Sequence, residues 1–401
     1  MAPKARAVTA KSLQALLTRI GAPSSGTKVI LQERLRREIN QSRLFNLHPT
    51  WEKSRPTDQK LRIMSIDMGI KNLAFCEAEI SYPVKGSLKA TMDVLRWEKT
   101  NLVPTRDDIP AFVLDSDEGT ENTADTDEDV DPYSLNILSK TAYGLVKSTI
   151  LAGAPDIILI ERQRWRSGGG SAVQQWTLRV NTLEGMLWAI LQTMYYERLL
   201  MQKHRKGKET LSKEKLYEIF GVDPKRVGNY WLGEQDIERP AAAPSPTKPT
   251  PDTDTHANLE EEDATAPPKK KPSRSKAEKK AKISLLRTWL SASPASTAAH
   301  TSTNTPALTF TIGPHAQATQ QALCSPKKSP RRKKDDEADE IGPTELKKLD
   351  DITDCFLQAA AWVSWESNRL QLCELVGDIK GEKVDEGVVR EMVRIVQGEE
   401  E

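Results

Sequence analysis

Leu61-Arg-Ile-Met-Ser-Ile-Asp67-Met-Gly69 is the most informative segment of this 401-residue chain. Its apolar and β-branched residues predict a buried strand that ends at Asp67, and Gly69 permits the tight turn that follows. A carboxylate at the end of a buried strand is placed to point into a cleft, where a metal ion is one of the few groups that can stabilise its charge. Aspartate also closes strands as an ordinary turn residue, so this interpretation depends on acids elsewhere in the chain.

The composition allows two or three domains but not a core along the whole chain, since 37% of residues are apolar and 29% are charged. The net charge of +1 conceals strong local segregation of charge. The four cysteines lie far apart without a CxxC pair, which indicates neither a zinc site nor a disulfide framework and favours a reducing compartment. No apolar run approaches the length of a membrane span, so we expect no membrane association.

Residues 8–40 are predicted to form two short helices around the loop 21–26. Their leucine spacing and the segment Pro23-Ser-Ser-Gly-Thr-Lys28 resemble the SAP motif, a helix–loop–helix module that binds DNA. A plain helical hairpin is the alternative. The basic N-terminus has no acid before Glu33, which fits an organellar presequence as well as the first helix of a basic domain.

A catalytic domain is predicted over 60–235. Strands at about 61–67, 72–80 and 92–98 suggest an antiparallel meander, followed by a disordered acidic insertion at 104–131. A helix over about 132–150 then leads to a strand that is apolar on both faces and ends at Glu161.

The second half of the chain alternates ordered and low-complexity segments. A helix over 172–200 has an apolar stripe wide enough to pack on a partner chain as well as on its own sheet, and the segment 220–232 is predicted to be loop and strand. Three further kinds of segment follow: disordered linkers at 236–275 and 291–342, a basic helix at 276–290, and a C-terminal helical region at 343–398.

Acids occupy two further positions of structural importance. Glu161 ends its strand as Asp67 does, and Asp350, Asp351 and Asp354 lie in the first turns of a predicted helix. Helix capping explains an acid at the helix start but not Asp354, which lies a turn later among apolar residues. Converging carboxylates repel one another unless cations neutralise them, and oxygen ligands without His or Cys favour Mg²⁺ or Mn²⁺. Two such ions about 3.5–4 Å apart stabilise both oxygens of a phosphodiester displacement.

Three segments carry a resemblance to a known family: Asp67-Met-Gly-Ile-Lys-Asn72, Ile160-Glu-Arg-Gln-Arg-Trp-Arg166 and Lys347-Lys-Leu-Asp-Asp-Ile-Thr-Asp-Cys-Phe-Leu-Gln358. In this order they resemble the fungal mitochondrial Holliday junction resolvases, cruciform-cutting endonucleases related to bacterial RuvC. The resemblance covers about 61–235 and 276–375. It implies an α/β fold, with an RNase H-like mixed sheet flanked by helices, a small N-terminal SAP-like module and disordered insertions. It also implies a homodimer that binds four-way junction DNA and makes paired symmetric nicks.

The resemblance implies roles for individual residues. Asp67, Glu161, Asp351 and Asp354 would be the catalytic and metal-binding acids for two Mg²⁺ or Mn²⁺ ions, with Asp350 as the alternative to Asp351. Asp67 would contact both ions, Glu161 one, and the helix acids the other. No small-molecule cofactor is expected. The basic residues expected to contact DNA phosphates are Lys28, Lys71, Arg162, Arg164, Arg166, Lys225, Arg226, Lys279 and Lys280.

Two other functions remain open from the sequence. One is an RNase H-like nuclease that acts on RNA or hybrid duplex, and the other is a non-enzymatic SAP-type DNA scaffold whose acids only cap helices and turns. The resemblance and the basic N-terminus predict a mitochondrial location, with the nucleus as the alternative. A junction resolvase would act in the recombination and segregation of mitochondrial DNA.

Overall fold

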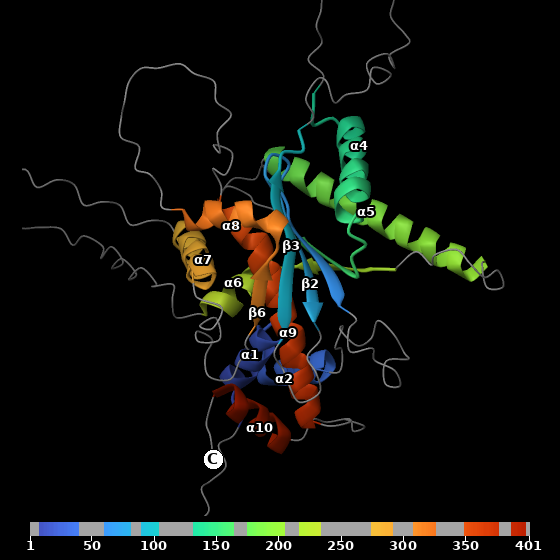
Figure 1. The fold of residues 1–401 in the computed structure, drawn as a ribbon. Coiled ribbons are helices and arrows are strands. Elements are labelled where there is room, and N and C mark those ends of the chain that lie inside the picture. The colour runs from blue at the N-terminus through green and yellow to red at the C-terminus, as the bar shows by residue number, and fades with distance from the viewer. Residues whose placement is uncertain are drawn as a thin grey trace, which may run out of the picture.

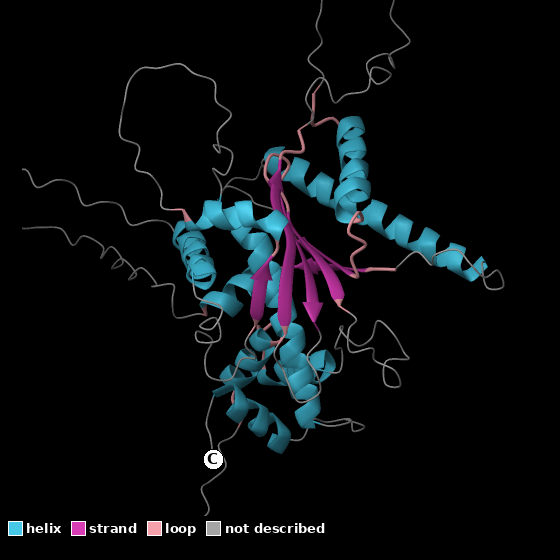
Figure 2. Ribbon diagram, in the orientation of Figure 1, coloured by secondary structure: helices cyan, strands magenta, loops and turns pink. Residues whose placement is uncertain are grey.

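The structure is a computed structural model (Figure 1). It describes residues 8–39, 60–81, 90–103, 131–163, 175–204, 216–233, 274–291, 308–325, 349–376 and 386–397. All but the last residue of the predicted acidic insertion 104–131, most of the predicted linker 236–275, and both Arg164 and Arg166 lie outside these residues. Within the described part, a mixed sheet separates two layers of helices (Figure 2).

A six-stranded sheet forms the centre of the fold, with the order β5-β4-β1-β2-β3-β6. Strands β1, β2 and β3 form the predicted antiparallel meander, while β4 and β5 run parallel to β1 on its other side. The prediction of a mixed α/β sheet flanked by helices is therefore confirmed. The strands are β1 (Leu61–Asp67), β2 (Leu73–Ser81), β3 (Thr91–Thr100), β4 (Ile157–Glu161), β5 (Glu218–Val222) and β6 (Thr309–Ile312).

Helices cover the two faces of the sheet unequally. Helix α9 (Leu349–Val376) lies across one face, against β1, β2 and β3, and Trp97 packs there on Phe356 with ring centroids 4.9 Å apart. The other face packs against α4 (Leu135–Leu145), the π-helical turn η2 (Val146–Ile150) and α5 (Gln175–His204). Because strand side chains alternate between faces, β1, β2, β4 and β5 contribute to both cores, whereas β3 and β6 contribute apolar residues to the α9-side core.

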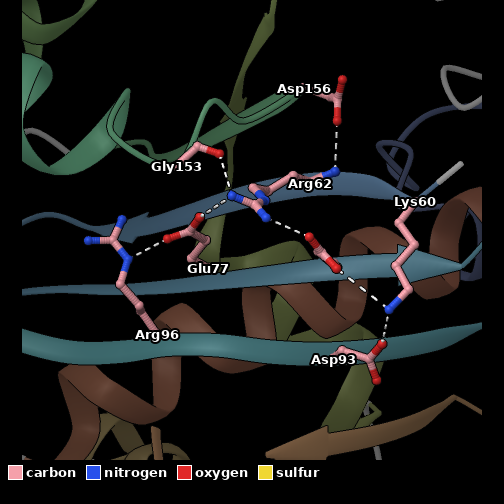
Figure 3. A network of polar contacts seen from close by, with 8 residues as sticks. Lys60, Arg62, Glu77, Asp93, Arg96, Gly153 and Asp156 are labelled. Carbon is pink, nitrogen blue, oxygen red and sulfur yellow. Dashed lines mark hydrogen bonds and ion pairs between the residues drawn. The ribbon is translucent and has the colours of Figure 1, made fainter. Parts of the chain in front are cut away.

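Part of the face opposite α9 carries charged residues in place of an apolar core (Figure 3). Arg62 Nη2 lies 2.5 Å from Glu79 Oε1, and Lys60 Nζ lies 2.9 Å from Asp93 Oδ2. Glu77, which is buried, forms an ion pair with Arg96. We call Lys60, Arg62, Glu77, Glu79, Asp93 and Arg96 the sheet network. In it, every carboxylate lies beside a cation.

The N-terminal helices α1 (Ala10–Arg19) and α2 (Lys28–Ile39) share a core with the C-terminal part of α9 and with α10 (Glu386–Gln397). Asn368 of α9 donates to the Arg19 carbonyl at 2.8 Å, and Arg369 donates to the Ile20 carbonyl at 2.6 Å. Two helices therefore lie in the predicted 8–40 module and pack on the same helix that carries the C-terminal acids. Their DNA-binding role stays a prediction.

The structure departs from the sequence prediction inside the linker 291–342. Residues 309–324 form β6, the short 3₁₀ helix η3 (Pro314–Ala316) and helix α8 (Gln317–Cys324). Strand β6 pairs with β3 in parallel, and Ala316 and Leu323 are buried. The Thr- and Ala-rich composition predicted a linker, but alternating Phe310 and Ile312 are enough to form a short edge strand.

A second departure concerns residues 220–232, predicted as loop and strand. Only β5 is a strand, and residues 224–232 form helix α6 (Pro224–Leu232). Asp223 caps this helix by accepting a hydrogen bond from the Lys225 amide at 2.9 Å, and Pro224 occupies the first helical position, where no amide hydrogen is needed. The predicted basic helix 276–290 corresponds to α7 (Arg274–Ser291). In the part of the chain described, no helix combines the length and apolarity needed to cross a membrane.

Candidate active site

The acids predicted at two strand ends lie side by side. Strands β1 and β4 are parallel neighbours with Ile66 opposite Ile160, so Asp67 and Glu161 follow at the same level. Ile63 and Leu159 belong to the α9-side core, and side chains two residues apart share a face. Asp67 and Glu161 are therefore directed to the face that α9 covers.

Helix α9 places the C-terminal acids over this pair. Asp350 and Asp351 lie in its first turn, where negative charge is favourable, and the helix then becomes apolar from Cys355 onward. Two indole groups fix the helix by donating to its carbonyls: Trp97 to Ile352 at 3.0 Å and Trp231 to Leu357 at 2.9 Å.

The electrostatics show that four acids converge. Burial raises the pKa of Asp67 well above its usual value, and so do the charge of Glu161, a hydrogen bond with Glu161, and the charges of Asp354 and Asp351. Burial and the charge of Glu161 likewise raise the pKa of Asp354, against the opposing effect of Lys282. Asp67 is 8% exposed, so solvent does little to screen this repulsion.

Lysines of α7 and β3 contact the helix acids. Lys282 Nζ lies 3.0 Å from Asp354 Oδ1, Lys279 Nζ lies 2.5 Å from Asp350 Oδ2, and Lys99 Nζ lies 3.9 Å from Asp351 Oδ2. The structure thus separates the two adjacent acids. Asp351 acts on Asp67 through its charge, whereas Asp350 is held by Lys279.

Two residues at this site were missed by sequence reasoning. Lys282 is almost fully buried, and it lies four residues before buried Leu286, on the apolar side of α7. A lysine on the apolar side of an amphipathic helix was the available signal. Glu184 of α5 accepts from the Gln163 amide at 3.0 Å, and burial raises its pKa. The sequence around Glu184, including Trp188 four residues later, contains no comparable signal.

The donor set fits a divalent cation in its chemistry. Buried carboxylates that repel one another become more stable when a hard cation lies between them, and oxygen-only donors suit Mg²⁺ or Mn²⁺. Among the described residues, no three Asp, Glu, His or Cys side chains already form the geometry of a metal site. The helix acids instead contact lysines, among them Asp354, which pairs with Lys282 through Oδ1.

The predicted DNA-contacting residues divide into three groups. Arg162 follows Glu161 directly and is exposed; its side chain crosses Gly221, where an added Cβ would lie 2.6 Å from Arg162 Nε. Arg226 is turned inward and donates to the Gly21 carbonyl at 3.3 Å, and Lys279 is engaged with Asp350. The residues Lys28, Lys71 and Lys280 are exposed, and Lys225 lies in the first turn of α6.

A mixed α/β sheet with carboxylates at the ends of β1 and β4, opposed by acids on a C-terminal helix, defines the structural class of this protein. Within that class, residues 63–372 match the family described as "Mitochondrial resolvase Ydc2 / RNA splicing MRS1". The match covers well over half of the chain. This chain therefore belongs to that family.

The chain is also similar to individual proteins. The chain is 29% identical over 174 residues to "Cruciform cutting endonuclease 1, mitochondrial" of Schizosaccharomyces pombe, an alignment that covers 42% of this chain and only 52% of that protein. It is 25% identical over 317 residues to the protein of the same name from Saccharomyces cerevisiae, covering 79% of this chain and 72% of that protein. The crystal structure of the yeast mitochondrial Holliday junction resolvase Ydc2 aligns over 90% of this chain and 95% of its own, with 18% identity and a TM-score of 0.45.

Proposed function

We propose that this protein is an endonuclease that resolves four-way DNA junctions by paired symmetric nicks. The observation that carries the proposal is the convergence of Asp67, Glu161, Asp351 and Asp354, which come from three distant segments of the chain. Carboxylates that only cap helices or turns have no reason to meet in a buried place where they raise one another's pKa. Membership in a family that includes resolvases supplies the reaction class.

These acids would hold two Mg²⁺ or Mn²⁺ ions. Asp67 would contact both, since it bonds Glu161 and its pKa is also raised by the charges of Asp351 and Asp354. The bound ions would activate water and stabilise charge on the scissile phosphate. The protein's own contribution is to keep the four carboxylates in one fixed place and to exclude bulk water around Asp67.

Exposed cations near the acids would bind the DNA backbone. Arg162 is the strongest candidate, since it is exposed and adjacent to Glu161, and Lys280 lies on the helix that also carries Lys282. Such contacts supply affinity that depends on salt and little choice of base. Lys28, Lys71 and Lys225 would also contribute to this surface, and Arg164 and Arg166, which lie outside the described residues, stay sequence predictions.

We call Asp67, Glu161, Asp351 and Asp354 the acid centre, and a homodimer would present two acid centres to one junction. Helix α5 is 30 residues long and extends beyond the sheet in Figure 1. Large apolar side chains remain exposed along it, Tyr196 at 58% and Leu200 at 54% among them. We propose that a second copy of this chain covers these side chains of α5, because a symmetric cutting reaction requires two copies. Replacing Tyr196 by Glu should then shift the sedimentation profile from dimer to monomer.

The names of the relatives support a mitochondrial location for this chain. The family description also includes RNA splicing, which makes an RNA ligand the alternative to junction DNA. The acids favour the nuclease, because a protein that only binds RNA needs no buried carboxylate cluster.

The decisive experiment compares four substrates at matched salt: a four-way DNA junction, linear duplex, RNA–DNA hybrid and structured RNA. We expect Mg²⁺-dependent paired nicks in the junction alone, with none when Mg²⁺ is withheld. Preferential cleavage of hybrid or RNA would instead identify an RNA-directed nuclease. Binding without cleavage of any substrate would leave the scaffold function.

A further inference from the structure

A single amide lies in the apolar core directly beneath the acid centre. Gln358 of α9 is 3% exposed and lies one helical turn after Asp354, on the same side of the helix. The core around it is built from residues such as Cys355, Phe356 and Ala359. Burying an amide in such surroundings is unfavourable unless its hydrogen bonds are made.

The hydrogen bonds of Gln358 join all three elements that carry acids. Its Nε2 lies 3.0 Å from Ser65 Oγ, 3.3 Å from the Ile66 carbonyl of β1 and 3.5 Å from the Leu159 carbonyl of β4. Ser65 Oγ in turn donates to the Cys355 carbonyl of α9 at 2.8 Å. We call Ser65 and Gln358 the amide clamp.

The clamp and the acid centre are two successive levels of one arrangement. Ser65 and Asp67 are two residues apart on β1 and share a face, while Ser65 is opposite Leu159 in the register with β4. Gln358 donates a hydrogen bond to Ser65 of β1. Asp354, one helical turn earlier on α9, acts through its charge on Asp67, two residues further along β1. The lower level therefore consists of neutral donors and acceptors, and the upper level consists of carboxylates.

We infer that Gln358 is a positioning residue for the acid centre. It ties α9 to β1 and β4 at points one or two residues from Asp67 and Glu161, so the separation of the acids depends on it. The amide is neutral, so it can hold mutually repelling carboxylates together without occupying them as a lysine would. This inference rests on the proposed function, since it assigns the clamp a role in binding the divalent ion and in cleavage.

The clamp restricts movement of α9 in one direction, along the strands. Apolar packing fixes how closely α9 approaches the sheet, but it resists sliding along the strands only weakly. Hydrogen bonds to two backbone carbonyls and one hydroxyl fix that register. A displacement of about 1 Å at a reacting centre costs on the order of 100-fold in rate, and loss of an outer hydrogen-bond partner typically costs about 10–100-fold in metal affinity or activity.

The test replaces Gln358 by Met, which has similar length and no hydrogen-bond donor. Trp231→Phe is the matched control, because it also removes a hydrogen bond that anchors α9, here from Trp231 to the Leu357 carbonyl, but Trp231 bonds neither β1 nor β4. Melting of the DNA-free protein is measured as Mg²⁺ is titrated, together with junction affinity in chelator and the single-turnover cleavage rate. For Gln358→Met we expect a Mg²⁺ midpoint about 10-fold higher and cleavage about 10–100-fold slower, with junction affinity unchanged. Trp231→Phe should keep the wild-type midpoint.

Ser65→Ala provides an independent variant, since it removes the other half of the clamp with little change in volume. It should shift the Mg²⁺ midpoint in the same direction, and combining it with Gln358→Met should add little, because both act through one contact. If both variants lower the melting temperature but keep the wild-type Mg²⁺ midpoint and cleavage rate, the clamp is only structural and the inference is wrong. A wild-type protein that fails to cut junctions would instead overturn the proposed function.

Discussion

Two clusters of charged residues lie on opposite faces of the same sheet, and their carboxylates are in opposite electrostatic states. In the sheet network, hydrogen bonding by Arg62 lowers the pKa of Glu79; for Asp93, burial is outweighed by hydrogen bonds from Thr311 and Lys60, and its pKa is also lowered. In the acid centre, burial and neighbouring acids raise the pKa of Asp67. Carboxylates with structural roles are therefore matched by built-in cations. Those of the acid centre exceed their cations, which is the arrangement that a divalent ion can complete.

The largest expected effect is on cleavage. Asp67→Asn keeps the shape of the side chain but removes the charge at the centre of the acids, so junction cleavage should fall by more than about 100-fold, beyond the usual cost of losing an outer partner. Junction binding should persist. A gel-based cleavage assay run beside a binding titration measures both, with Glu79→Gln as the control on the opposite face. Unimpaired cleavage by Asp67→Asn would remove Asp67 from the active site.

The sheet network should respond in stability and not in metal dependence. Glu77→Gln leaves Arg62 and Arg96 without a buried partner charge. Breaking a fully buried pair costs about 3–5 kcal/mol, and because these arginines are about 30% exposed we expect roughly 2 kcal/mol, or about 4–8 °C in melting temperature. The Mg²⁺ midpoint should not change. A shift in that midpoint would mean that the two clusters are coupled through the sheet.

The pH dependence of stability should differ in sign between the clusters. The pKa of Asp67 is raised by folding, so folded protein retains a proton that the unfolded chain loses above its pKa near 3.8. In chelator, the stability of the folded protein therefore falls as the pH rises from the unfolded pKa of Asp67 towards its higher folded pKa. Asp67→Asn lacks that loss and should melt about 2–4 °C above wild type at neutral pH, a difference of about 1 kcal/mol.

The same melting series checks the opposite sign in the sheet network. The pKa of Glu79 is lowered by folding, so its contribution is present above the unfolded pKa of 4.5 and is lost as the pH falls through the folded pKa. Glu79→Gln should therefore approach wild-type stability at low pH.

For Asp67→Asn, the melting temperature is expected to exceed that of wild type by more at pH 7 than at pH 4. A difference in melting temperature that shrank from pH 4 to pH 7 would contradict the burial of an uncompensated charge.

The smallest expected effect is on salt dependence. Arg162→Gln should weaken junction binding and reduce the slope of log affinity against log salt by about 0.9, the value for one phosphate contact. Lys147→Gln removes an equal charge from η2, on the face opposite α9, and serves as the control. Equal slopes for both variants would show that Arg162 does not contact the DNA backbone.

The sequence predicted the parts of this site that local patterns specify. Glu161 follows an uninterrupted apolar run, and Asp67 follows a strand in which only Arg62 and Ser65 are polar, which is enough to place both acids at strand ends. The sequence did not separate Asp350 from Asp351, because adjacent helix residues differ only in the direction they face, and that direction is set by the packing of α9. Gln358 is a similar case, because it is an ordinary polar residue until its partners across the core are known. Lys282 differs, since its place on the apolar side of α7 is visible in the sequence.

The missed elements are short and depend on distant pairing. Strand β6 has four residues and exists because β3 offers it a free edge.

Helix α6 differs from β6, because its start is specified locally. Asp223 and Pro224 form a recognisable helix start, which the prediction of loop and strand did not take into account.

More than two thirds of the chain separates Asp67 from Asp354. A ribosome that adds about 5–20 residues per second needs roughly 15–60 s to travel that distance. For most of this interval the nascent chain carries both strand acids without the helix acids that complete their cluster. A DNA-cutting activity that depends on both would therefore be silent in every product of translation that ends before Asp354.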